Sequence, residues 1–192
     1  MKTQPDFKEF YNSYFEKIHQ YLVRLVGPYL AEDVAQEVFN KAHKNMASLK
    51  EPSKVSQWLY KIATNTAIDK TKTLSYTYLD KKKGEVPDRI HDQNVWTGKT
   101  SEFIDQKIIN VQMRSCVQEF IDRLPANFKT VLLLKDYESK SNKEIADILN
   151  ITVATVKIRY HRAKEHLKKE LDAGCNFFYD DENNLQCDRK QK

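Results

Sequence analysis

The chain has 192 residues, of which 40% are apolar and 31% charged, and its net charge of +5 is only mildly basic. This length allows one domain or two small ones, and the charge permits nucleic-acid binding without establishing it. No apolar run follows Met1, and no stretch approaches the roughly 20 apolar residues that span a bilayer. Three cysteines do not make a disulfide framework. We therefore expect a cytoplasmic protein that does not insert into a membrane.

The first part of the chain, residues 6–72, has the periodicity of amphipathic helices. Only 4 Gly and 5 Pro interrupt the whole chain, and apolar residues recur at three- and four-residue steps over residues 7–25. A Gly-Pro pair is expected to end this helix, and residues 31–45 are expected to form the next. A turn-rich loop over residues 48–53 then precedes a third helix over residues 55–72.

Residues 73–100 lose this periodicity and contain a lysine run and several Gly and Pro residues, which predicts a flexible linker. A second helical part covers residues 101–171, and its first helix is expected to end before Leu124-Pro125. Residues 172–192 form a C-terminal extension in which Gly174 can end the preceding helix. The sequence therefore predicts an all-α fold with two helical domains joined by a flexible linker.

The strongest local signal is a helix-turn-helix between Ser141 and Lys157. Ser141 and Glu144 have the spacing of a capping box at the start of a short helix. Asn150 tolerates the left-handed conformation of a tight turn, and Thr152 is a good N-cap for the second helix. These features together predict a DNA-binding module.

The second helix of this motif is basic. Residues 151–171 contain six basic and two acidic side chains, a balance of +4. Such a helix can enter the major groove and bind phosphates. The alternative is a solvated basic helix in an ordinary bundle, which does not explain why the turn residues and the charge coincide.

Three segments follow one another along the chain: AEDVAQEVF at residues 31–39, WLYKIATNTAID at residues 58–69, and Leu124-Pro125 with the apolar run and helix-turn-helix after it. In this order they resemble the extracytoplasmic-function (ECF) sigma factors of the sigma-70 family. Residues 31–39, AEDVAQEVF, are similar to the AED-x-x-QE-x-F segment of region 2. Residues 58–69, WLYKIATNTAID, are similar to its WLY-x-IA-x-N-x-x-x-D segment. Leu124-Pro125, the apolar run 131–134 and the helix-turn-helix resemble region 4. The resemblance covers about residues 7–171.

The resemblance implies an RNA polymerase subunit that directs transcription initiation. It places region 2 at 6–72 and region 4 at 101–171, and implies docking on the core polymerase through the β′ clamp and the β flap. The clamp would bind Asp33, Gln36 and Glu37. Promoter DNA is the second expected partner, and an anti-sigma factor is expected from the family alone.

The resemblance also implies that the loop over residues 48–57 captures a base flipped out of the −10 element, which costs a few kcal/mol. The residues expected at the −10 element are Ser48, Lys50, Lys54, Lys61, Asn65, Lys70 and Lys72. Tyr60 is also expected to face the single strand, whereas Trp58 is expected in the core. Lys72 stands where the family usually has an arginine. Lysine retains the positive charge but cannot make the bidentate contact of a guanidinium group.

Region 4 would present one face of its second helix to the −35 element. The expected contacts are Thr152, Ala154, Thr155, Lys157 and Arg162, with Ile158 on the same face. The sequence does not decide which of them contact bases and which contact phosphates. Arg159 is expected to help the helix dock on its own domain.

The C-terminal extension contains Cys175 and Cys187. These two cysteines could sense redox state or bind a metal, but zinc sites usually have about four ligands and the extension has no histidine. We therefore expect no metal, and a tail that is either mobile or packed through Phe177, Phe178 and Tyr179.

Two other functions remain to be weighed. A helix-turn-helix regulator that is not a polymerase subunit would share the second part of the chain but leaves the first part unexplained. An enzyme is disfavoured because the sequence has no Gly-rich phosphate loop, no HExxH motif and no nucleophile set. We expect no catalysis and no cofactor.

Overall fold

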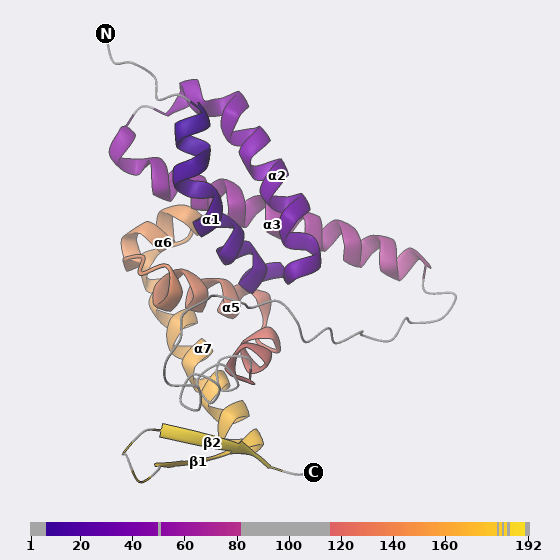
Figure 1. Ribbon diagram of the computed structural model, residues 1–192, viewed down its shortest axis with the longest axis vertical. Coiled ribbons are helices and arrows are strands. Elements are labelled where there is room, and N and C mark those ends of the chain that lie inside the picture. Colours follow the sequence, from indigo (N-terminus) through magenta and orange to yellow (C-terminus); the bar gives the residue numbers. More distant parts are fainter. Residues whose placement is uncertain are drawn as a thin grey trace.

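The computed structural model of the chain describes residues 7–49, 51–81, 116–179, 181, 183 and 185–190. Helices dominate these residues, and a hairpin of two antiparallel strands lies near the C-terminus (Figure 1). The prediction of an all-α fold is confirmed, and the hairpin is an addition that the sequence did not indicate. Among the described helices, none combines the length and the apolar character needed to cross a membrane.

The first half consists of three helices and two short 3₁₀ turns: α1 (Phe7–Val26), α2 (Pro28–Asn45), η1 (Met46–Ser48), η2 (Pro52–Lys54) and α3 (Val55–Lys81). The break between α1 and α2 lies at Gly27, whose φ of 87° is in the left-handed region that glycine adopts at little cost. Pro28 then starts α2, where its missing N–H is not needed. All three helices pack on one another (Figure 1).

A buried polar contact joins α1 to α3. The hydroxyl oxygens of Tyr21 and Thr64 lie 2.8 Å apart, and both residues are fully buried. Burial raises the pKa of the Tyr21 phenol. A buried hydroxyl without a partner costs about 1–3 kcal/mol, so this pair favours one position of α1 along α3.

The third helix is longer than expected. The sequence predicted its end at about Lys72, but α3 continues to Lys81. This prediction was wrong because the end of the apolar periodicity was taken as the end of the helix. Residues 54–83 contain no Gly or Pro, and a helix with no breaker propagates readily once it has formed. Residues 82–100 of the predicted linker lie outside the described residues.

The second half contains a helical segment over residues 116–122, then α5 (Ala126–Leu132), the π-helical turn η3 (Leu133–Tyr137), α6 (Asn142–Leu149) and α7 (Val153–Gly174). The segment 116–122 ends before Leu124-Pro125, as predicted, and the earlier part of its expected helix, 101–115, lies outside the described residues. α7 packs on α5 and α6. The second half contributes fully buried side chains to the same hydrophobic core as the first half, and these include Ile121, Val131, Leu133, Leu134, Ile145 and Ile148.

The C-terminal extension folds as a hairpin of β1 (Cys175–Tyr179) and β2 (Leu185–Arg189), at the far end of α7 (Figure 1). One of the two expectations for this tail was that its aromatic side chains pack inward. The aromatic side chains of β1 instead face solvent. Phe177, Phe178 and Tyr179 are 42%, 45% and 66% exposed. A strand that lies at a domain edge buries only what its neighbours cover, and here the inward position is taken by Cys175.

Candidate nucleic-acid and polymerase interfaces

Local hydrogen bonds set the geometry of the helix-turn-helix. The Glu144 N–H donates to Ser141 Oγ at 3.2 Å, and the Ser141 N–H donates to Glu144 Oε2 at 2.8 Å. Asn150 has φ 53° and ψ 49°, in the left-handed region. The Thr155 N–H donates to Thr152 Oγ1 at 3.1 Å and so caps α7. The capping box, the left-handed turn and the N-cap are all confirmed.

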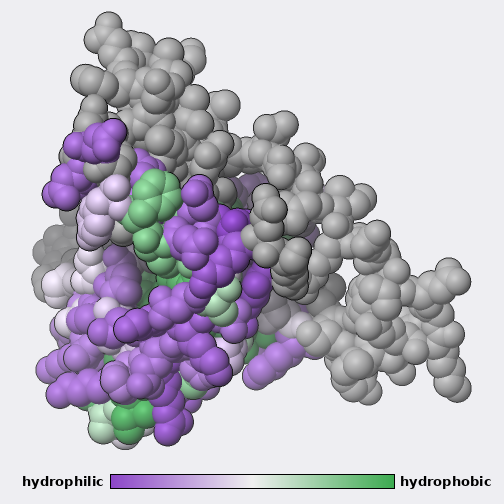
Figure 2. Space-filling view, turned by 90° about the horizontal axis from the view of Figure 1, so that it is seen from below, coloured by the Kyte–Doolittle hydropathy of each residue, from purple (hydrophilic) through white to green (hydrophobic). Residues whose placement is uncertain are grey.

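The N-terminal half of α7 exposes the residues expected at the −35 element. Thr152, Ala154, Lys157 and Arg162 are exposed, and Thr155 is half-buried with its hydroxyl 2.8 Å from that of Thr152. The opposite face of the helix contains the fully buried Val156 and Ala163. Beyond this segment, the end of the molecule that carries the hairpin is mostly hydrophilic, with small apolar areas (Figure 2).

Tyr160 holds α7 on its domain through a hydrogen bond, while the docking role expected of the half-buried Arg159 stays a prediction. Its hydroxyl donates to Asp136 Oδ1 at 2.7 Å, and the Lys164 amine lies 4.6 Å from the centre of its ring. The hydrogen bond to Asp136, more than burial, raises the pKa of Tyr160 to about 12. Tyr160 was not among the residues expected to matter, although Val156, Tyr160 and Ala163 have the spacing of an inward face.

The acidic and amide side chains of α2 lie on its outer face. Asp33 and Gln36 are exposed, whereas Glu37 is half-buried and pairs with Lys41 at 2.8 Å. The Lys41 amine also donates to Thr66 Oγ1 of α3 at 3.1 Å. Glu37 is therefore partly engaged inside the protein, while Asp33 and Gln36 remain accessible to a partner.

The basic residues of α3 form an exposed stripe. Lys61, Asn65 and Lys72 are exposed and follow one another at steps of four and seven residues, which places them on one face of the helix. Lys70 is half-buried. Lys54 is exposed and pairs with Glu51 at 2.8 Å.

The expected −10 loop lies around the turns η1 and η2. Lys50 lies outside the described residues, and Ser48 is described only by its backbone, in the turn η1. Trp58 packs against the core, as expected.

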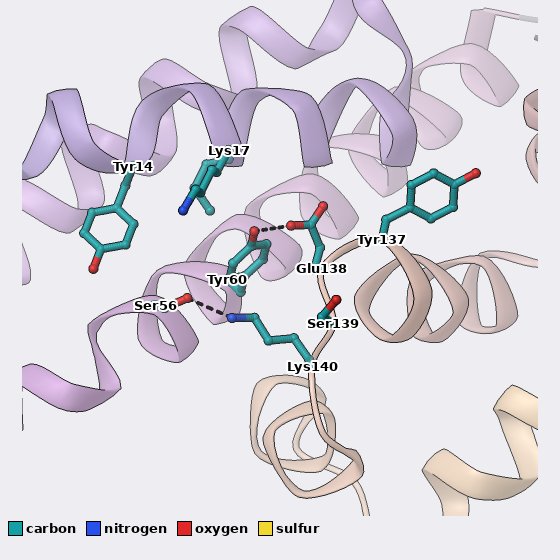
Figure 3. A pocket seen from close by; sticks show the side chains of 9 residues that line it. Tyr14, Lys17, Ser56, Tyr60, Tyr137, Glu138, Ser139 and Lys140 are labelled. Atoms are coloured by element: carbon teal, nitrogen blue, oxygen red, sulfur yellow. Dashed lines mark hydrogen bonds between the residues drawn. The ribbon is translucent and has the colours of Figure 1, made fainter. Parts of the chain in front are cut away.

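Tyr60 points inward instead of toward a single strand. It is 4% exposed, and its hydroxyl donates to Glu138 Oε2 of the second half (Figure 3). Glu138 Oε1 also lies 3.6 Å from Arg24 Nη1 of α1. Burial, followed by the carboxylate, raises the pKa of the Tyr60 phenol. Sequence alone could not find this pairing, because Glu138 follows Tyr60 by 78 positions and belongs to no motif.

Further polar contacts join the start of α3 to the second half. The Lys140 amine donates to Ser56 Oγ at 2.8 Å and lies 4.6 Å from the centre of the Tyr60 ring (Figure 3). The Gln57 amide donates to Asp147 Oδ2 of α6 at 2.9 Å. Together with the Tyr60 and Arg24 contacts of Glu138, we call this set the interdomain contact. A cavity of about 240 Å³ lies beside it, with Tyr14, Lys17 and Tyr137 also in its lining.

Comparison with known proteins agrees with this geometry. Residues 10–75 match the family model described as Sigma-70 region 2, and residues 114–167 match Sigma-70, region 4. The chain is 37% identical over 171 residues to the ECF RNA polymerase sigma factor SigW of Bacillus subtilis, covering 88% of this chain and 90% of SigW. The chain belongs to the ECF sigma factors of the sigma-70 family.

Other relatives support the same family. The RNA polymerase sigma-H factor of Pseudomonas aeruginosa is 31% identical, with 82% of each chain covered. Among solved structures, the sigma factor RpoE in complex with the anti-sigma factor NepR from Bartonella quintana has a TM-score of 0.68 at 18% identity, covering 87% of this chain and 97% of that chain. At this identity the likeness shows the fold alone, and that fold is the one described above.

Proposed function

We propose that this sigma factor binds core RNA polymerase and directs it to promoters, with duplex recognition at the −35 element and single-strand capture at the −10 element. The observation that carries the proposal is the capped α7, whose polar and basic N-terminal half is exposed in a chain that also has a region 2. The protein carries out no chemistry itself, needs no cofactor or metal, and acts in the cytoplasm beside the polymerase.

Region 4 reads the −35 element through α7. Thr152, Ala154 and Thr155 lie at the N-terminus of the helix, the end that enters the major groove in this motif. Lys157 and Arg162 provide positive charge along the same exposed half. Each phosphate contact made by such side chains adds to a salt-dependent affinity.

Region 2 captures the melted −10 element. The stripe of Lys61, Asn65 and Lys72 follows the single strand, and Lys54 before the stripe and Lys70 within it add charge. The turns on both sides of Lys50, with the backbone of Ser48, would receive the flipped base. A positively charged groove that tracks the backbone suits single-stranded DNA.

The outer face of α2 docks on the β′ clamp of the polymerase through Asp33 and Gln36, with Glu37 available once its contact with Lys41 is given up. Region 4 contacts the β flap. An anti-sigma factor is a further partner. Two solved structures with this fold support it, because RpoE was solved in complex with the anti-sigma factor NepR and CnrH in complex with the cytosolic domain of CnrY. The CnrH structure has a TM-score of 0.59 at 18% identity, and the match covers 90% of this chain and 91% of that chain.

Run-off transcription on fragmented genomic DNA, with purified core polymerase, tests the proposal. Discrete transcripts that depend on the protein are expected. The double variant Asp33→Ala/Gln36→Ala should lose transcripts and core binding in gel filtration but keep duplex DNA binding. Asn40→Ala, also exposed on α2, is the control and should behave as wild type. No transcripts despite intact duplex binding would favour the alternative, a regulator that is not a polymerase subunit.

A second pair of variants tests the −35 assignment, with the same loss of charge in both. Lys157→Ala/Arg162→Ala removes two positive charges from the proposed DNA face of α7. Lys168→Ala/Lys169→Ala removes two from exposed positions further along the same helix. Only the first pair should abolish protection of the −35 element in footprints. Equal losses would mean that α7 contributes general charge rather than recognition.

A further inference from the structure

All three cysteines of the chain meet at one place in the second half. Cys116 lies in the helical segment 116–122, Cys175 begins β1 and Cys187 lies in β2. The sulfur atoms of Cys116 and Cys175 are 4.0 Å apart although 59 positions separate these residues. Burial, followed by the charge of the nearby Cys116, raises the pKa of the Cys187 thiol. The three thiols are free in this structure.

Packing around the thiols fixes this arrangement. Gly174 lies against the ring of Phe120, so closely that an added Cβ would be 2.6 Å from it. Phe120 is one helical turn after Cys116, so the same contact brings Cys116 beside Cys175. Arg189 of β2 binds Glu119. The hairpin is therefore anchored on the segment 116–122 from both of its strands.

The geometry favours one pair of thiols over the other. Cys175 is paired with Arg189 in the ladder and Cys187 with Phe177, so the two strand cysteines are diagonal neighbours rather than directly opposite. Cys116 approaches Cys175 from another element, and a side-chain rotation can close the 4.0 Å gap. Within the described residues no group of three or more His, Cys, Asp or Glu is arranged to hold a metal ion.

We propose that Cys116 and Cys175 are a redox modification site, at which a peroxide converts the two thiols into a reversible disulfide. Cys116 is half-buried and reachable from solvent, whereas Cys175 is 3% exposed. Hydrogen peroxide oxidises the Cys116 thiol to a sulfenic acid and is itself reduced to water. The Cys175 sulfur then attacks the sulfenic sulfur, the S–S bond forms, and the hydroxyl leaves with the Cys175 proton as a second water.

Burial, with a contribution from the neighbouring thiols, raises the pKa of Cys175 to about 11, so its thiolate is scarce at neutral pH and the second step is slow. A dithiol reverses the modification by exchange. The disulfide closes a loop over residues 116–175, which contains the whole helix-turn-helix. It therefore ties the start of this unit to the far end of α7 and stabilises it against unfolding.

The test is non-reducing peptide mapping of the full chain after treatment with hydrogen peroxide. The expected result is a cross-linked peptide with Cys116 and Cys175, a fall from three reactive thiols to one, and full reversal by dithiothreitol. Thermal melting of the oxidised chain should give a higher Tm than the reduced chain. Cys187→Ser is the matched control and should still form the cross-link, whereas Cys116→Ser should not.

Three results would overturn the proposal. These are three thiols that remain reactive, oxidation confined to Cys187 or to links between two molecules, and a zinc or copper(I) ion that the full chain binds stoichiometrically through these thiols. Cys116→Ser is included because a substitution at the buried Cys175 could disturb folding, whereas Cys116 is partly exposed. Transcription is not part of the readout. The redox proposal can therefore fail while the proposed sigma function stands, and the sigma function can fail while the redox proposal stands.

Discussion

Glu138 helps to hold the two halves of the molecule together, and Glu138→Gln is expected to weaken the contact between them. Its side chain is only 11% exposed, accepts the Tyr60 hydroxyl and faces Arg24. Glutamine keeps the shape but removes the charge. A hydrogen bond to a charged group contributes about 1.5–3 kcal/mol, and Arg24, at 25% exposure, recovers part of its solvation. We therefore expect the interdomain contact to weaken by about 2 kcal/mol.

A change of this size shifts the ratio of undocked to docked molecules about 30-fold, because every 1.4 kcal/mol is a factor of ten. The interdomain contact covers Ser56, Gln57 and Tyr60 at the start of α3, beside the proposed −10 loop. If the polymerase takes up the undocked form, its apparent Kd falls by up to about 30-fold in Glu138→Gln. Tyr60→Phe removes the same hydrogen bond and should act in the same direction.

The assay is a titration of core polymerase against immobilised sigma factor, with circular dichroism to confirm that each variant is folded. Glu16→Gln is the control, since Glu16 is exposed on α1 and only accepts a hydrogen bond from Gln20. Unchanged or weaker binding by both Glu138→Gln and Tyr60→Phe, with the fold intact, would refute the idea that the contact competes with polymerase binding.

Three further predictions concern the second half of the chain. Thr152→Ala removes the N-cap of α7 and should lower the free energy of unfolding by about 1 kcal/mol in denaturant melts, whereas Thr152→Ser should retain most of it. Hydrogen bonds from Ser141, first its side-chain contact and then its backbone N–H, lower the folded pKa of Glu144. The ionised Glu144 therefore stabilises the fold fully above the ordinary carboxyl pKa, and this stabilisation is lost as the pH falls through the lowered pKa of Glu144. A series of melts between pH 3 and pH 6 on wild type and Glu144→Gln checks this. Gly174→Ala places a methyl group on the Phe120 ring and should cost about 1–3 kcal/mol and reduce peroxide cross-linking, as measured by melts and peptide mapping.

The sequence predicted most of the fold because its signals are local. The capping box at Ser141, the left-handed Asn150 and the N-cap at Thr152 each act within one helical turn, so their spacing in the sequence is already their spacing in space. The same holds for the outer face of α2, where Asp33 and Gln36 follow from the helical period. The end of α3 was missed because helix propagation needs no amphipathic pattern.

Tertiary structure decided what distant residues do to one another. Tyr60 has the sequence context of a DNA contact, yet its ring is covered by Lys140 and its hydroxyl is bound by Glu138, which lies 78 positions away. No sequence motif singles out Cys116. The packing of Gly174 against Phe120 brings the sulfur of Cys175 to 4.0 Å from the sulfur of Cys116. Periodicity and capping act over a few residues, whereas these pairings depend on how helices and strands pack, which no local pattern encodes.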